Sequence, residues 1–162
     1  MNKLNFQIRS AREKDYPAVN RLYCAWQKYH HQLLPNIFKE RLVKTFIKRS
    51  DYIGLLEDRK AVIFIATVEK QIIGFAEVQF DNVQAADDHY GSKQANIEYL
   101  YVLPEHQNKG VGKSLIATAI DWSIKKNRDY LSVSVYNDNE EALNLYQKNE
   151  FQPLSTRLVK KL

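Results

Sequence analysis

The chain has little of several residue types that particular protein classes require. Its single cysteine, Cys24, can form neither an internal disulfide nor a thiolate zinc cluster, and such sparse cysteine is typical of a reducing cytoplasm. No apolar run approaches the roughly 20 residues that a membrane-spanning helix needs, and the first residues lack the apolar stretch of a signal peptide. We therefore expect a cytoplasmic protein with no membrane partner and no metal site.

Proline and glycine are also scarce, with four and five residues among 162. They form no Pro/Gly-rich linker, and the sequence contains no internal repeat and no low-complexity tract. A chain of this length suits one hydrophobic core, and 44% hydrophobic with 27% charged residues is an ordinary globular composition. The sequence therefore predicts a single domain over residues 1–162.

Positive charge is in excess, with a formal net charge of +5 at pH 7. The basic residues are spread along the chain rather than gathered in a run, and no recognised nucleic-acid motif accompanies them. We therefore expect a solvated basic surface and no nucleic-acid partner. A ligand that carries several phosphates would be favoured by such a surface.

Hydrophobic periodicity predicts strands and helices that alternate along the chain. Strands are expected at 6–9, 61–68, 72–79, 95–103 and 130–135, with one or two more from 151 onward; helices are expected at 13–30, 37–48, 110–126 and 138–148. A tight turn at 69–71 predicts an antiparallel hairpin, and Ser10 is a candidate cap for the first helix. This order of elements favours an α/β fold whose mixed sheet is covered by helices on both faces.

The strongest local signal lies between the strand at 95–103 and the helix that follows it. It consists of Gln107, Asn108, Lys109, Gly110, Val111, Gly112 and Lys113. The first amides of a helix have no intrahelical acceptor and lie at the positive end of the helix dipole, so a pyrophosphate is favoured there. Glycines let the backbone approach such a ligand closely, and the two lysines add positive charge. The run therefore predicts a pyrophosphate-binding site.

A nucleotide-binding P-loop is the competing interpretation of the same run, because Gly112, Lys113 and Ser114 resemble its last residues. The full P-loop pattern needs a glycine five residues before Gly112, and that position is Gln107. The P-loop interpretation therefore fails.

The pattern that does fit, Gln/Arg-x-x-Gly-x-Gly/Ala, resembles the acetyl-CoA signature of the GNAT superfamily of N-acetyltransferases. A second segment resembles another motif of that family, Asn-x-x-Ala-x-x-x-Tyr-x-x-x-Gly-Phe. The matching residues are Asn139, Ala142, Tyr146 and Phe151. Glu150 stands where the family usually has glycine, at a helix C-terminal position that favours the left-handed conformation. The resemblance covers nearly the whole chain, but it is specific only from about residue 97 to 151.

This resemblance implies the GNAT fold, in which two adjacent strands, those ending near 103 and at 130–135, splay apart to admit the pantetheine arm of acetyl-CoA. It also implies direct transfer of the acetyl group to a primary amine of a small molecule or a protein. The residues that it places beside the cofactor are Leu100, Tyr101, Val102, Gln107, Asn108, Lys109, Gly110, Val111, Gly112, Lys113, Asn139 and Tyr146. In the family, a backbone amide near Val102 is the expected donor to the oxyanion.

Two side chains are candidates for the proton transfers, because the attacking amine must lose a proton and the leaving thiolate must gain one. The resemblance places Tyr146 beside the thioester as the general acid, while the alternative is a tyrosine that only packs in the core. Strand alternation puts Glu98 on the same face as Leu100 and Val102. The family often uses a glutamate on this strand as the general base or substrate anchor, and the alternative is an exposed or ion-paired carboxylate.

Other assignments remain open at the level of sequence. Asn139 either contacts the cofactor arm or belongs to a capping box, formed by Asp138 and Glu141, that starts a helix. The adjacent His30 and His31 lie about 100° apart on a helix, so they do not form a zinc pair. A non-catalytic acyl-CoA-binding module is the alternative function, and a homodimer is a further expectation because dimers are the commonest assembly of soluble proteins.

Overall fold

The computed structural model describes residues 4–40, 44–84 and 91–160, in which five strands form one sheet in the order β1-β2-β3-β4-β5. The strands are β1 (Gln7–Ser10), β2 (Ala61–Val68), β3 (Gln71–Phe80), β4 (Gln94–Val102) and β5 (Tyr130–Val133). The first four pair antiparallel with their neighbours, and β5 pairs parallel with β4. The mixed, mostly antiparallel sheet is therefore confirmed, as is the hairpin of β2 and β3.

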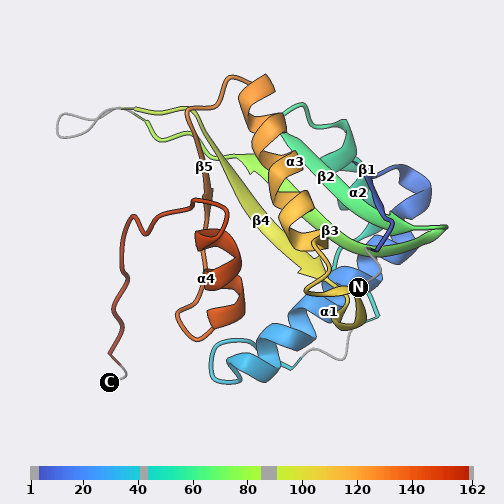
Figure 1. Ribbon diagram of the computed structural model, residues 1–162, viewed down its shortest axis with the longest axis horizontal. Coiled ribbons are helices and arrows are strands. Elements are labelled where there is room, and N and C mark those ends of the chain that lie inside the picture. Colours follow the sequence, from blue (N-terminus) through green and yellow to red (C-terminus); the bar gives the residue numbers. More distant parts are fainter. Residues whose placement is uncertain (1–3, 41–43, 85–90, 161–162) are drawn as a thin grey trace.

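Helices cover both faces of this sheet (Figure 1). They are α1 (Tyr16–Leu33), α2 (Arg49–Glu57), α3 (Val111–Lys125) and α4 (Glu140–Gln147), with short 3-10 turns at Glu13–Asp15 and Pro104–His106. The helix α3 packs on one face, and α1 and α2 pack on the other. None of the helices in the described ranges is both long and apolar enough to cross a bilayer.

The core beneath α3 is built mainly from aliphatic side chains. Its fully buried members include Ile73, Val78, Leu115 and Ile116, to which α4 adds the buried Tyr146. These side chains come from alternate positions of the strands and from one face of α3, which is the pattern that predicted the elements. This side of the sheet is therefore a conventional hydrophobic core.

The core beneath α1 and α2 is rich in aromatic rings instead. Tyr23 contacts Phe75 at a ring-centroid distance of 4.4 Å and Tyr99 at 5.1 Å, and it stacks parallel on Phe46 at 5.2 Å. The ring of Tyr99 also meets Trp26 edge-on at 4.9 Å. Such pairs prefer edge-to-face or offset geometry because the ring faces are negative and the edges positive. The stacking of Phe46 on Tyr23 thus holds the chain segment around Phe46 against α1.

A β-bulge interrupts the pairing of β3 with β4. Glu77 and Val78 are consecutive on β3, but their partners on β4 are Tyr99 and Ile97, so Glu98 is the extra residue. A bulge shifts the alternation of side chains between the faces. As a result Ile97 belongs to the α3 core while Tyr99, two residues later, belongs to the α1 core.

The strands β4 and β5 run side by side over only part of their length. Their register extends from Gln94 with Tyr130 to Ile97 with Val133, whereas β4 continues to Val102. Figure 1 shows the two strands diverging toward the end of β4 that leads to α3. The predicted splay is therefore present, and β5 is shorter than the expected strand at 130–135.

The predicted helix at 37–48 is wrong in its described part, since residues 37–40 and 44–48 are not helical and 41–43 lie outside the described residues. Asn20 of α1 holds this segment instead: its Oδ1 accepts from the amide of Phe46 at 2.9 Å, and its Nδ2 donates to the Lys44 carbonyl at 2.9 Å. Tertiary hydrogen bonds therefore replace intrahelical ones. The helix that the sequence did not predict, α2, packs through the buried Tyr52.

The predicted strands after residue 151 are also absent from the described residues, because 151–160 adopt no regular structure. Pro153 has no amide proton to give to a sheet, and Leu154, Leu158 and Val159 are 91%, 88% and 86% exposed. In Figure 1 this segment runs along the outer side of α4, away from α3.

The first helix starts without a side-chain cap, so the proposed role of Ser10 is wrong. Asp15 fixes this corner instead. Its carboxylate accepts from both terminal nitrogens of Arg9, at 2.7 and 2.9 Å, and from the Arg12 amide at 2.8 Å. The hydrogen bonds from Arg9 hold the pKa of Asp15 below its usual value.

Candidate functional site

The run that predicted a pyrophosphate site forms a turn with an open helix end. Gly110 is the N-cap of α3 at φ 86°, a left-handed conformation that glycine adopts without strain, and Asn108 also has a positive φ of 57°. The first backbone hydrogen bond of α3 runs from Ser114 N to Gly110 O at 3.0 Å. Among the described residues, no acceptor is found for the amides of 108–113. These amides are therefore available to an anion.

Gln107 ties this turn to the end of β4. Its Nε2 donates to the Val102 carbonyl at 2.9 Å, so the side chain positions the loop from within. Lys109 folds back as well, since its Nζ donates to the Glu105 carbonyl at 2.8 Å, while Lys113 is exposed. Both lysines belong to the same loop and first helical turn as the open amides.

The second glycine of the run has a packing role. A Cβ built on Gly112 would lie 3.2 Å from Leu145 Cδ2, so the first turn of α3 approaches α4 closely. At Gly110, by contrast, nothing lies within 4 Å of the position that a Cβ would occupy. The two glycines therefore act differently: Gly110 permits the turn, and Gly112 permits the approach of two helices.

The end of β4 presents backbone groups to the opening beside β5. The carbonyl of Val102 is bound by Gln107, while the next amide, that of Leu103, donates to Ile73 of β3 at 2.9 Å. Because the N–H and C=O of one strand residue point to the same edge, those of Val102 point away from β3. By alternation those of Leu100 do too, whereas the Tyr101 side chain is buried on the α1 side. The opening is thus lined by polar backbone.

Tyr146 lies in the α3 core near this opening. Its side chain is only 7% exposed and packs edge-on against Phe151 at 5.3 Å. Burial raises its pKa, and no hydrogen bond from its hydroxyl is found in the part of the chain that the structure describes. The hydroxyl therefore keeps its proton at neutral pH and has a donor bond to give.

Glu98 is exposed, and the prediction that it shares a face of the sheet with Leu100 and Val102 is wrong. The bulge turns it away from Leu100 and Val102 to the side of Asn96, whose Nδ2 donates to Glu98 Oε1 at 2.8 Å. Ser132 of β5 donates in turn to Asn96 Oδ1 at 3.1 Å. The carboxylate therefore lies on the α1 side of the sheet, opposite the α3 core that holds Tyr146.

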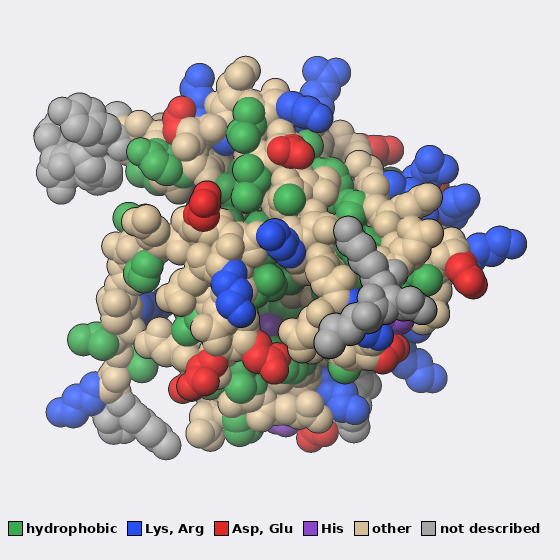
Figure 2. Space-filling model, in the orientation of Figure 1, with side chains coloured by type: hydrophobic (Ala, Val, Ile, Leu, Met, Phe, Trp, Pro, Cys, Tyr) green, Lys and Arg blue, Asp and Glu red, His purple; other side chains and the backbone are tan. Residues whose placement is uncertain are grey.

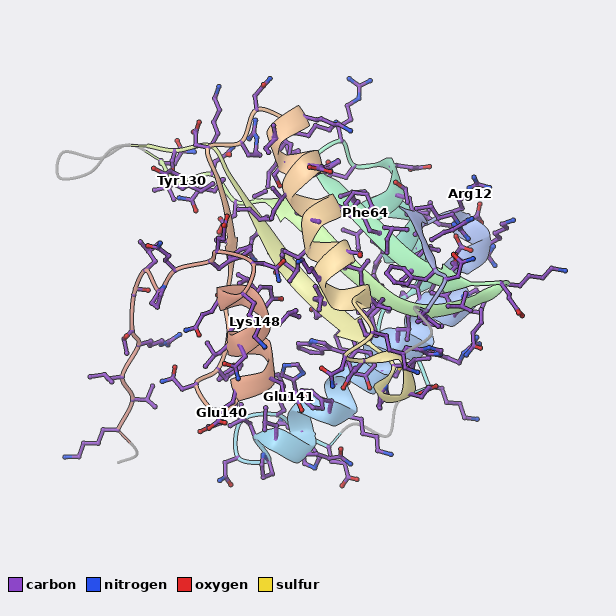
Figure 3. The ribbon with its side chains drawn as sticks, viewed as in Figure 1. Arg12, Phe64, Tyr130, Glu140, Glu141 and Lys148 are labelled. Atoms are coloured by element: carbon purple, nitrogen blue, oxygen red, sulfur yellow. The ribbon has the colours of Figure 1, made fainter. Side chains whose placement is uncertain are left out.

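Asn139 is the N-cap of α4, with Oδ1 accepting from the Ala142 amide at 3.2 Å, so the cap expected at Asp138 lies one residue later. The same oxygen accepts from the hydroxyl of Tyr29 on α1, also at 3.2 Å. Figure 3 shows Glu140 and Glu141 at this end of α4, toward α1. The contact links α1 to α4, which sequence alone did not predict.

Sequence reasoning also missed Glu77, a carboxylate that is 2% exposed on β3. Its Oε2 accepts from the hydroxyl of Tyr23, and its Oε1 accepts from Gln79 Nε2 at 2.6 Å. Burial raises its pKa, while the hydrogen bonds act in the opposite direction. The available signal was a single acidic residue between apolar neighbours in a predicted strand.

No group of His, Cys, Asp or Glu that could hold a metal ion occurs among the described residues. His30 is buried: its Nδ1 lies 2.9 Å from the Trp26 carbonyl, and burial lowers its pKa. Lys and Arg side chains are scattered over the face shown in Figure 2 and form no single patch there.

The loop after β4, the open N-terminus of α3 and the split between β4 and β5 agree with the comparison to known families. Residues 16–151 match the Acetyltransferase (GNAT) family. The chain belongs to this family and is an acetyltransferase. The uncharacterized N-acetyltransferase YhfO of Bacillus subtilis (strain 168) is 24% identical over 147 residues, which cover 90% of this chain and 89% of YhfO.

Solved structures share the fold of this acetyltransferase. A mutant of the BH1408 protein from Bacillus halodurans has a TM-score of 0.89 at 18% identity, covering 96% of this chain and 99% of that protein. The aminoglycoside 6'-N-acetyltransferase AAC(6')-Ih from Acinetobacter baumannii has a TM-score of 0.75 at 15% identity, covering 98% of both chains. At these identities the likeness concerns the fold.

Proposed function

We propose that this acetyltransferase moves the acetyl group of acetyl-CoA directly to a primary amine. The observation that carries the proposal is the row of free amides at 108–113, beside an opening whose far side holds an exposed carboxylate. The donor thioester and the acceptor amine can then meet in the opening from the two sides of the sheet.

The free amides and the positive end of the α3 dipole bind the cofactor's pyrophosphate. Lys109 and Lys113 add charge beside it. The pantetheine arm then follows β4, where the outward amides of Leu100 and Val102 offer hydrogen bonds. Tyr101 lies between these two amides, with its side chain buried toward α1 and its backbone facing β3.

The amide of Val102 is the proposed donor to the oxyanion that forms when the amine attacks the thioester. A fixed backbone donor needs no reorganisation during the reaction, and one such donor typically contributes about 10²–10³ in kcat. Gln107 holds the carbonyl of the same residue, which points to the same edge of β4 as the Val102 amide.

Tyr146 is the proposed proton donor to the leaving thiolate. A thiol has a pKa near 8.5, below that of a phenol near 10, and burial raises the pKa of Tyr146 further. The hydroxyl is therefore protonated throughout the working pH range. It can donate a hydrogen bond to the sulfur as negative charge develops there; full transfer of its proton is uphill for the more weakly acidic phenol, which then regains a proton from solvent.

Glu98 is the proposed acceptor of the amine's proton, through a water molecule. A free alkylamine has a pKa of about 10.4, so most of it arrives as an unreactive ammonium at neutral pH. Glu98 is exposed on the α1 side; Asn96 holds one oxygen at 2.8 Å, and no hydrogen bond to the other is found among the described residues. We propose that Asn139 contacts the pantetheine arm only at the N-terminal end of α4, which its side chain caps.

A thiol-release assay with acetyl-CoA against a panel of amines tests this function. Structures of aminoglycoside N-acetyltransferases share the fold, so the panel includes aminoglycosides beside polyamines, amino acids and peptides with free amines. Amine-dependent release of CoA thiol with formation of the acetylated amine is expected. Stabilisation by acetyl-CoA without turnover on any amine would instead leave a protein that only binds the cofactor.

A further inference from the structure

Glu77 is a buried carboxylate whose charge no cation neutralises within the described part of the chain. Both of its hydrogen-bond donors, Tyr23 and Gln79, are neutral groups. A buried anion is costly unless it is paired or used, and neither the cofactor site nor the proposed proton transfers use this one. The position of Glu77 in the sheet indicates which interaction uses its charge.

Glu77 is the register partner of Tyr99, directly after the bulge residue Glu98 on β4. Register partners lie side by side, so Tyr99 adjoins Glu77, and burial together with the charges of both glutamates raises the pKa of its phenol. Tyr99 and Trp26 are half-buried and their rings meet edge-on at 4.9 Å, so aromatic rings lie beside the register position of Glu77 on the α1 side. The acceptor side of the bulge thus combines aromatic rings with one buried and one exposed anion.

This combination recognises a cation. Ring faces attract ammonium groups, and a carboxylate inside an aromatic shell is screened less by water than one at the surface. The titratable groups that interact with Glu77 are Tyr23 from α1, Glu98 from β4 and Tyr99 from β4, and none of them is basic.

The cation is not the nitrogen that attacks: Glu77 is buried with both oxygens hydrogen-bonded, so unlike Glu98 it cannot take up that nitrogen's proton, and its charge would only stabilise the ammonium form. The charge must therefore sit on a second group of the acceptor, which stays positive while the reacting amine becomes neutral. Resting on the proposed acetyl transfer, we propose that Glu77 is a specificity-determining residue that selects acceptors carrying a second positive charge, such as diamines and polyamines.

The test compares four amines of one length that differ only at the far end: 1,5-diaminopentane, 5-aminopentan-1-ol, pentylamine and 5-aminopentanoate. The measured quantity is kcat/KM from thiol release at pH 8 and low salt. The diamine is expected to exceed the amino alcohol about tenfold after correction for its two equivalent ends, and the amino acid is expected to be the poorest. Equal values for the diamine and the amino alcohol would overturn the proposal.

The variant Glu77→Gln keeps the shape and an oxygen that accepts from Tyr23, but it removes the charge. Its ratio of diamine to amino alcohol is expected to fall toward one, mainly through KM of the diamine. Glu57→Gln, which removes one exposed charge at the end of α2, serves as the matched control and is expected to keep the parent ratio. A Glu77→Gln protein that folds and keeps the parent ratio would also overturn the proposal.

Two further measurements keep these outcomes separable. Tyr99→Leu removes the ring but leaves the carboxylate, and it is expected to reduce the diamine ratio even where Glu77→Gln does not fold. Failure of the parent to acetylate any amine of the wider panel would refute the proposed function itself, whereas acetylation without preference for a second charge refutes only the role of Glu77.

Discussion

The two faces of the sheet differ in their chemistry, and the sequence predicted the α3 face better than the α1 face. The α3 face is aliphatic, carries a loop with a recognisable spacing, and ends in free backbone amides. The α1 face is aromatic, encloses the carboxylate of Glu77, and is held by side chains such as Asn20 that bridge distant segments. Backbone chemistry on one face suits a constant donor, and side-chain chemistry on the other suits a particular acceptor.

The largest effect is expected from a negative charge at the open end of α3. Gly112→Glu places a carboxylate at the free amides, where it competes with pyrophosphate and repels it. Loss of acetyl-CoA binding and of activity is expected, measured as loss of the thermal shift. For the parent that shift reflects about 2.7 kcal/mol at 100 times the dissociation constant.

Two variants control for the packing of Gly112 on Leu145. Gly54→Glu adds the same side chain to α2, where nothing lies within 4 Å, and should keep the shift. Gly112→Ala adds bulk without charge and should weaken binding less than Gly112→Glu does. Equal loss in both Gly112 variants would point to helix packing rather than to phosphate recognition.

The next effect concerns Tyr146, the proposed proton donor on the α3 face. Tyr146→Phe removes only the hydroxyl, so kcat should fall by about 10²–10⁴ while acetyl-CoA affinity stays near the parent value. Steady-state kinetics and the thermal shift measure the two quantities separately. Tyr130→Phe, which alters a tyrosine 63% exposed on β5, is the control. Parent-like turnover of Tyr146→Phe would leave Tyr146 as a packing residue.

The corresponding change on the α1 face is Glu98→Gln. It should lower kcat/KM strongly near neutral pH, and the deficit should shrink as the pH approaches the amine's own pKa, because more amine arrives neutral. Full pH profiles of kcat and kcat/KM measure this. A rise in KM for the amine with unchanged kcat would indicate an anchor instead, and superimposable profiles would remove Glu98 from the mechanism.

A smaller effect on stability is expected at the start of the α1 face. The pKa of Asp15 is lowered in the folded protein, so its contribution is present above the unfolded value near 3.9 and is lost as pH falls through the folded value. Asp15→Asn loses hydrogen bonds to a charged partner, each worth about 1.5–3 kcal/mol. Near pH 7 the Tm should fall by roughly 3–12 °C. At pH 2 most of this difference should vanish, and a constant difference would contradict the assignment.

The smallest effect is the pH dependence that Glu77 adds to stability. Its folded pKa is raised above the unfolded value near 4.3, so the folded state holds the proton more tightly. Stability is therefore lost as pH rises through that interval. The Tm of Glu77→Gln relative to the parent should increase between pH 4.5 and pH 8. A difference that stays constant over this range would show that Glu77 titrates alike in both states.

Much of the α3 face could be predicted because its signals are local. The strand, the loop from Gln107 to Lys113 and the helix are adjacent in the chain, and their periodicity and spacing predict them directly. The predictions were wrong where residues distant in the sequence determine the local structure. The segment at 44–48 is held by Asn20, and the face on which Glu98 lies follows from a bulge that depends on pairing with β3.

The sequence by itself indicated the family, the hairpin of β2 and β3 and the candidate cofactor loop, because each rests on residues close together in the chain. Only the tertiary structure decided that Glu98 lies on the α1 side, that Tyr29 reaches Asn139 across 110 positions, and that Glu77 is buried beside Tyr23. Burial and hydrogen-bond partners are set by which elements pack together, and no spacing along the chain records them.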